Sequence, residues 1–138
     1  MEMRRLLGFA LAVLMAAGCR SEPVASPYAT ATVFFLGWDL ESRQSLTPKD
    51  VRRGASPFST TDASEINKLV AHLRLDSLVP DDGTREDARL VVDLVLKNGQ
   101  EVTYFASYFS LVAPATHQKH AIDDAFRSRF RVGKRPRW

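Results

Sequence analysis

The chain of 138 residues contains a single cysteine, Cys19, so no disulfide can form within it and its stability must come from an apolar core. It lacks a glycine-rich phosphate-binding loop, a Gly-x-Ser-x-Gly nucleophile elbow and a zinc-protease helix motif. These absences lower the expectation of an enzyme. No uncharged run reaches the roughly 20 residues that a membrane-spanning helix needs. The formal net charge of +3 is too small to indicate nucleic-acid binding.

The first residues follow the pattern of a secretory signal peptide. Arg4 and Arg5 give a positive start, an uncharged run from Leu6 to Ala17 follows, and the run ends in small residues. We therefore expect residues 1–18 to be removed on export.

The end of this run, Leu14-Met15-Ala16-Ala17-Gly18-Cys19, resembles the lipobox of bacterial lipoproteins. In that family the cysteine receives a diacylglyceryl group and becomes the new N-terminus, so the resemblance implies lipidation of Cys19. The usual box has leucine where this chain has Ala16. Arg20 stands where inner-membrane members have aspartate, so the resemblance implies an outer-membrane location facing the periplasm. The alternative is an ordinary signal peptide that happens to contain a cysteine.

The rest of the chain is expected to form one domain on a short tether. Residues 19–29 contain two prolines and several small or polar residues, which is typical of a linker. We find no repeats or low-complexity segments. We therefore expect a single domain over residues 30–133, followed by a basic tail over 134–138.

Three segments before residue 80 carry clear secondary-structure signals. The β-branched and aromatic stretch from Thr30 to Trp38 predicts an interior strand, because both of its faces are apolar. Thr47 and Pro48 signal the start of a short helix. The clearest helix is predicted over 62–75, where apolar residues recur at helical spacing and Asp62 can cap the first turn. Those apolar residues are Ile66, Leu69, Val70 and Leu73.

A β-hairpin is predicted around Asn98-Gly99, which lies between two alternating runs and favours a two-residue type I′ turn. This turn would place Leu94 opposite Thr103 and Val92 opposite Phe105. One face of the hairpin would then be apolar and would pack on the helix. The apolar set is Leu90, Val92, Leu94, Leu96, Phe105 and Phe109, and the opposite face carries Arg89, Asp93, Tyr104 and Tyr108.

A last helix is predicted from about His120 to Arg131, because Ile122, Phe126 and Phe130 share a stripe. The predicted order is then β-α-α-β-β-α. This order indicates a small two-layer α+β domain, with an antiparallel-leaning sheet, a central β-hairpin and helices on one face.

The second face of the hairpin, with Arg89, Asp93, Tyr104 and Tyr108, is the candidate binding face. Tyrosine brings a large contact area with little loss of entropy. Arg89 could also lie over Tyr108 in a cation–π pair. The alternative is a set of ordinary cross-strand pairs with no partner.

Catalytic and metal sites are not expected. His117 and His120 could share a helical face, but zinc would need a third and a fourth ligand. The paired carboxylates Asp123 and Asp124 suit the start of a helix, which already explains them, and Asp81-Asp82 lies in a loop. We predict no cofactor, no metal and no catalytic residue.

The C-terminal stretch RSRFRVGKRPRW holds six cations in twelve residues. It could lie on an anionic envelope surface, although a solvated tail is the simpler interpretation. These features together favour a lipid-anchored, periplasm-facing, non-catalytic binding or accessory module with a protein partner at the sheet face. An immunity-type protein is one sub-case, which is suggested only by the small size and the predicted cellular location. The alternatives are an envelope hydrolase or metal-dependent enzyme using His117, His120 and Asp123 or Asp124, and a structural envelope lipoprotein.

Overall fold

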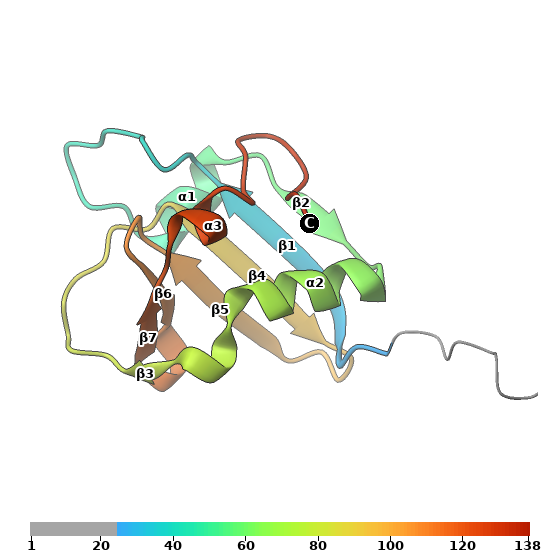
Figure 1. Ribbon diagram of the computed structural model, residues 1–138. Helices are drawn as coiled ribbons and strands as arrows, with labels where there is room; N and C mark the ends of the chain where they lie inside the picture. The colour runs from blue at the N-terminus through green and yellow to red at the C-terminus, as the bar shows by residue number, and fades with distance from the viewer. Residues whose placement is uncertain (1–24) are drawn as a thin grey trace, which may run out of the picture.

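The computed structural model describes residues 25–138, which form one seven-stranded antiparallel sheet with three α-helices (Figure 1). The predicted signal peptide and Cys19 lie outside the described residues. The strands are ordered β2-β1-β4-β5-β6-β7-β3 across the sheet. They are β1 (Tyr28–Phe35), β2 (Phe58–Thr60), β3 (Val79–Pro80), β4 (Leu90–Leu96), β5 (Glu101–Ala106), β6 (Ser110–Ala113) and β7 (Gln118–Ala121). The helices are α1 (Pro48–Gly54), α2 (Ala63–Leu73) and α3 (Asp124–Arg127), with 3₁₀ turns η1 (Leu75–Ser77) and η2 (Pro114–Thr116).

The predicted class, an α+β domain with an antiparallel sheet, is confirmed. The predicted strand over 30–38 corresponds to β1, which lies between β2 and β4 and is therefore interior. The predicted order lacked β2, β3, β6 and β7. Within residues 25–138, no helix combines the length and the apolar character needed to cross a membrane.

Local capping explains where α1 and α2 begin. The Thr47 hydroxyl accepts the Asp50 amide while the Asp50 carboxylate accepts the Thr47 amide, which is the reciprocal pattern of a capping box. Asp62 caps α2 by accepting the amide of Glu65. α2 ends where Arg74 adopts a left-handed conformation with φ of 50°. Both predicted helices are confirmed, and α2 is slightly shorter than the predicted range.

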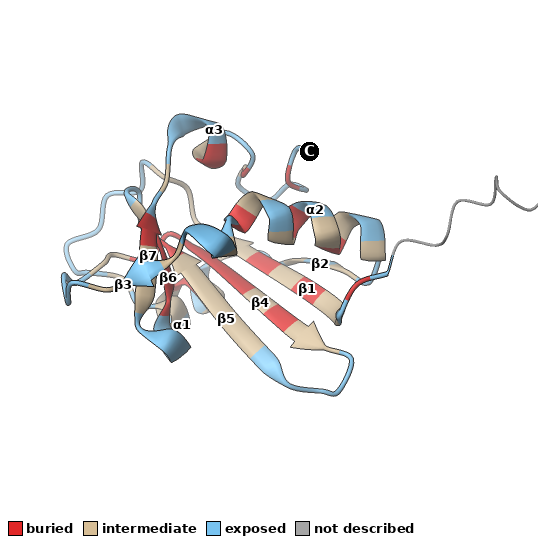
Figure 2. Ribbon diagram, turned by 60° about the horizontal axis from the view of Figure 1, so that its bottom comes forward, coloured by how far each residue is buried: buried red, intermediate tan, exposed pale blue. Residues whose placement is uncertain are grey.

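The main core lies between α2 and the sheet. Ile66, Leu69 and Leu73 of α2 are at most 2% exposed, and they pack against β1 and β4 together with Phe126 and Phe130. Figure 2 shows buried positions along β4 and on the side of α2 that faces the sheet. Burying one such side chain contributes roughly 1.5–3 kcal/mol, so this face carries most of the apolar stabilisation.

α1 covers the opposite face of the sheet, so the prediction that the helices share one face is wrong. Its buried Val51 packs with Ala88 and Val91, and Phe34, Leu36 and Phe105 lie around them. The reason is visible in β4, where Leu90, Val91 and Val92 are all fully buried. Because consecutive side chains of a strand point to opposite faces, a strand buried on both faces needs cover on both.

The hairpin between β4 and β5 differs from the predicted register by one residue. Leu94 pairs with Val102 and Val92 pairs with Tyr104. The turn has three residues rather than two, since the Leu96 amide donates to the Gln100 carbonyl and only Gly99 has a positive φ, of 88°. A shift of one residue exchanges the faces of a strand. Tyr104 therefore points toward α2, and Phe105 points toward α1.

The predicted helix over His120–Arg131 is mostly wrong. Gln118–Ala121 forms β7, which pairs with β6 and β3, and only Asp124–Arg127 is α-helical. The amide of Ile122 donates to the carbonyl of Phe109, which fixes the exit from β7. Pairing with β6 outweighs the helical spacing of Ile122, Phe126 and Phe130 in this segment. The last two of these still reach the core.

Candidate functional site

The candidate binding face predicted from the sequence does not exist as one surface. Asp93 lies on the α1 side of the sheet, where Arg52 of α1 donates to it, whereas Tyr104 packs against the α2 core. Arg89 immediately precedes β4 and is buried there. Tyr108 lies beyond the end of β5, in its connection to β6. The change of register in the hairpin separates the residues, because it moves Tyr104 to the other face.

Arg89 is a structural residue in the fold, only 8% exposed. Its guanidinium pairs with Asp87 at 2.7 Å and donates to the Leu40 carbonyl at 2.8 Å. Asp87 in turn accepts the amide of Leu46. These contacts fasten the loop between β1 and α1 to the start of β4, so Arg89 is not available to a partner. It makes no cation–π contact with Tyr108.

Asp93 belongs to a half-buried network on the α1 side. It accepts two hydrogen bonds from Arg52 of α1, at 2.8 and 2.7 Å, and one from the Thr103 hydroxyl at 2.7 Å. Burial by itself raises the pKa of Asp93, but the hydrogen bonds from Arg52 and Thr103 outweigh it and hold the pKa below its ordinary value. The network ties α1 to β4 and β5.

Tyr104 is half-buried beneath the α2 layer. Burial raises the pKa of its phenol, and the neighbouring Tyr28 adds to the effect. It therefore serves mainly as a core aromatic residue. Of the predicted set, Tyr108 is the most exposed residue, at 40%.

Tyr108 and Phe109 form what we call the aromatic tip. Phe109 is 70% exposed, and the two rings meet edge to face with centroids 5.2 Å apart. The turn is held by Ser107, whose hydroxyl accepts the amides of Phe109 and Ser110 at 3.1 and 3.0 Å. Arg127 of α3 lies over the Tyr108 ring at 4.2 Å and donates to the Tyr108 carbonyl at 2.6 Å. The predicted cation–π pair thus exists with Arg127 in place of Arg89.

The residues of the predicted catalytic alternative do not converge. Both ring nitrogens of His120 lie within hydrogen-bonding distance of backbone carbonyls, those of Ala121 and Leu73, at 2.9 and 2.7 Å. Asp123 caps α3 through the Phe126 amide, which lowers its pKa, and Asp124 pairs with Arg127. His117 is exposed at the end of η2. In the described part of the chain, no group of three or more His, Cys, Asp or Glu residues could hold a metal ion.

The acidic pair Asp81-Asp82 binds a lysine of the chain itself. Lys119 of β7 approaches Asp82 at 2.6 Å, Glu86 at 3.4 Å and Asp81 at 3.5 Å. The hydrogen bond from Lys119 lowers the pKa of Asp82, and the Thr84 amide adds to this. The pair therefore fastens the loop before β4 to β7.

The C-terminal stretch RSRFRVGKRPRW, interpreted above as a solvated tail, is folded back on the domain, although Lys134, Arg135 and Arg137 are exposed. Pro136 is buried, and the Trp138 ring lies 5.7 Å from His72 and 6.4 Å from Phe130. Gly133 has a φ of 65° and turns the chain back on itself. The turn is closed because the Arg137 amide donates to the Arg129 carbonyl at 2.8 Å. We call residues 129–137 the basic loop.

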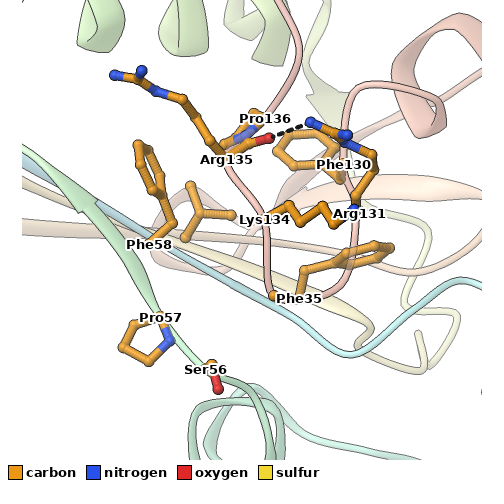
Figure 3. Close-up of a pocket in the computed structure, with 11 residues that line it drawn as sticks. Phe35, Ser56, Pro57, Phe58, Phe130, Arg131, Lys134, Arg135 and Pro136 are labelled. Carbon is orange, nitrogen blue, oxygen red and sulfur yellow. Dashed lines mark hydrogen bonds between the residues drawn. The ribbon is translucent and has the colours of Figure 1, made fainter.

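A hollow of about 110 Å³ lies beneath the basic loop, between it and the segment that leads into β2 (Figure 3). In Figure 3, Arg131 donates a hydrogen bond of 3.2 Å to the carbonyl of Arg135 across the bend of the loop. The hollow has an aromatic part and a cationic part, and no carboxylate is among its lining residues. The aromatic residues are Phe35, Phe58 and Phe130, and the cations are Arg131, Lys134 and Arg135.

Comparison with known proteins finds no matching protein family, no similar curated protein and no similar solved structure. The described residues offer two candidate surfaces, the aromatic tip and the hollow beneath the basic loop. Sequence reasoning singled out Tyr108 and the basic stretch, but it missed Phe109, which it placed in the core.

Proposed function

We propose that this protein is a lipid-anchored, periplasm-facing module of the bacterial cell envelope that binds a protein partner and catalyses no reaction. The lipobox-like stretch ending at Cys19 supports the anchor. The observation that carries the binding function is the aromatic tip, where Phe109 is held 70% exposed.

The aromatic tip has the properties of a preorganised anchor. Single exposed apolar side chains are common on protein surfaces. Here two adjacent aromatic rings contact each other, and their backbone is fixed by Ser107 and Arg127. A rigid aromatic side chain loses little entropy on binding, and such residues dominate the energy of protein interfaces.

The tip lies at the end of the sheet remote from the tether. Tyr28, where the chain enters the sheet, pairs with Leu96 at one end of β4. At the other end Leu90 pairs with Ala106, which is followed by Ser107 and then by the tip. β1 has eight residues and spans roughly 25 Å at 3.3 Å per residue. A domain tethered through Cys19 would thus present the tip away from the membrane.

The anchor is tested by mass spectrometry of the mature protein purified from membranes. We expect an N-terminal Cys19 that carries a diacylglyceryl group and lacks residues 1–18. A free thiol at Cys19 in a chain that retains residues 1–18 would contradict the anchor.

The binding site is tested by photo-crosslinking in intact cells, with the crosslinker placed at Phe109. The matched control places it at Lys97, which is exposed in the hairpin turn at the other end of the sheet. We expect one discrete protein adduct from position 109 and none of the same mass from position 97. The yield of this adduct should also fall when Tyr108 is changed to Ala in the crosslinker variant.

The identity of the captured protein distinguishes the sub-cases. A toxin as the captured protein would specify an immunity role. No adduct at position 109 would favour a structural lipoprotein without a partner at the tip.

A further inference from the structure

The basic loop concentrates positive charge in a folded segment. Five cations lie within nine residues: Arg129, Arg131, Lys134, Arg135 and Arg137. Within residues 25–138, only one of them has a carboxylate within ion-pairing distance, and that is Arg135, which pairs with Glu65 of α2. Each of the arginines at 129 and 131 donates instead to a backbone carbonyl of the same loop.

The like charges of the loop repel one another, and a free tail could reduce the repulsion by extending into solvent. The loop instead folds back at Gly133 and is held by the burial of Pro136 and the packing of Trp138. The Nε of Arg131 is also buried without a hydrogen-bond partner, which is uncommon for a buried donor.

The hollow beneath the loop is suited to one compact anion. Its volume of about 110 Å³ is several times the roughly 30 Å³ that a water molecule occupies in the liquid. It is well below the roughly 300–1,000 Å³ of pockets that enclose whole small molecules. A ligand could therefore place one charged group in it, while its remainder stayed outside beside Phe58.

We infer that the hollow beneath the basic loop is a binding site for a phosphate group, with Arg131 and Lys134 as its main cationic contacts. A phosphate has oxygens on several sides and can be met by an arginine fork and a lysine point charge together. A carboxylate is planar and can be met by one arginine fork, as Asp93 is met by Arg52 with one further hydrogen bond from Thr103. The site is separate from the aromatic tip and does not depend on a protein partner.

The first experiment uses the mature protein purified in a neutral detergent. Its melting temperature is measured in a buffer of inorganic phosphate and in a chloride buffer of equal ionic strength. Phosphate stabilises folded proteins in general, so three proteins are compared: the wild type, Lys134→Gln and Lys97→Gln. Lys134 makes no side-chain hydrogen bond or ion pair in the described chain, so its replacement removes charge and leaves the packing intact. Lys97→Gln makes the same change of charge in the hairpin turn.

We expect phosphate to raise the melting temperature of the wild type and of Lys97→Gln by the same amount, and of Lys134→Gln by clearly less. In chloride, Lys134→Gln should melt at or above the wild-type temperature, because the repulsion in the loop is relieved. Isothermal titration with phosphate should show affinity about fivefold weaker for Lys134→Gln, the factor that roughly 1 kcal/mol represents. Equal responses of the three proteins to every phosphate probe would overturn the inference.

The source of the phosphate is distinguished with two further probes. sn-Glycerol 3-phosphate presents a soluble phosphate monoester, and vesicles of phosphatidylglycerol with phosphatidylcholine present phosphodiesters on a membrane. Hydrogen exchange of residues 129–137 is followed in each case, with pure phosphatidylcholine vesicles as the control. Slowed exchange with glycerol phosphate indicates a soluble ligand, and slowed exchange only on the anionic vesicles indicates lipid headgroups. Unchanged exchange in both cases, together with equal melting responses, contradicts the site.

Discussion

The two faces of the sheet are held by different kinds of interaction. On the α2 side, a continuous apolar core joins α2, β1, β4 and the aromatic residues around α3. On the α1 side, the buried apolar cluster has only Val51, Ala88 and Val91 at its centre. Around it lie charged networks, Arg52 with Asp93 and Arg89 with Asp87.

This difference gives the two faces different roles: one mainly stabilises the domain, and the other mainly positions α1 and the loop before it. Apolar burial is non-directional and scales with area, so the α2 side contributes most of the folding free energy. Charge-assisted hydrogen bonds are directional and contribute less, so the α1 side mainly sets where α1 and the loop before it lie. Four predictions test the contrast, in order of decreasing effect.

The largest effect is expected from the same substitution made on each face. Phe126→Ala should lower the free energy of unfolding by about 3–5 kcal/mol, because the ring is 1% exposed and packs on Trp38, His72 and Phe130. Phe105→Ala should cost about 1–2 kcal/mol, since Phe105 is only half-buried. Urea unfolding measures both values. Equal costs would show that the two faces contribute alike.

Loss of the Arg52 pair should have an intermediate effect. Asp93→Asn keeps the shape of the side chain but removes the charged carboxylate, whose oxygens accept two hydrogen bonds from Arg52. The free energy of unfolding, measured in urea, should fall by about 1–2 kcal/mol. The control is Asp39→Asn, an exposed carboxylate, which should change stability by less than about 0.5 kcal/mol. If the two variants unfold at the same urea concentration, the network does not contribute to stability.

The contribution of Asp93 should depend on pH in a defined direction. Its pKa is lowered in the folded state, so folding favours the charged form. The stabilisation is then complete above the unfolded pKa of about 3.8 and is lost as the pH falls through the lowered folded pKa. The stability difference between the wild type and Asp93→Asn should therefore be constant from pH 7 to about 5 and shrink below pH 4. A difference that stays constant down to pH 2 would show that the charge is not its origin.

The smallest effect is expected at Gly99, in the turn that sets the register between β4 and β5 and so determines which side chains lie on each face. Gly99 has a φ of 88° and an added Cβ would contact nothing within 4 Å, so Gly99→Ala should cost about 1 kcal/mol through backbone strain alone. Gly99→Asn should cost less, because asparagine tolerates a positive φ. A neutral Gly99→Ala variant would mean that the three-residue turn is not required.

Much of the first half of the fold could be predicted from local patterns. The strand β1 and the helices α1 and α2 have strong signals of their own, in apolar spacing and in the caps Thr47 and Asp62. The hairpin was predicted at the right place but in the wrong register, because Asn98-Gly99 suits both a two-residue and a three-residue turn. The pairing of β4 with β5 along their whole length decides between them, and the hydrogen bond from the Leu96 amide to the Gln100 carbonyl closes the three-residue turn.

The candidate site was harder to predict because its residues come together through contacts distant in sequence. Arg127 reaches Tyr108 from a separate helix, and Trp138 contacts His72, which lies 66 positions earlier in the chain. Phe109 looked like a core residue because it alternates with Phe105 in the sequence. The turn formed by Ser107 and Ser110 interrupts that alternation and leaves Phe109 in solvent.

The sequence by itself determined the α+β class, the interior position of β1, the start of both longer helices and the lipobox resemblance at Cys19. These features depend on residues close together in the chain, where spacing and side-chain type are sufficient. The tertiary structure alone decided the hairpin register, the folding of residues 118–121 as a strand and the packing of the basic loop. In each of these cases, pairing or burial against a distant segment outweighs the local preference, and a local preference contains no information about that distant segment.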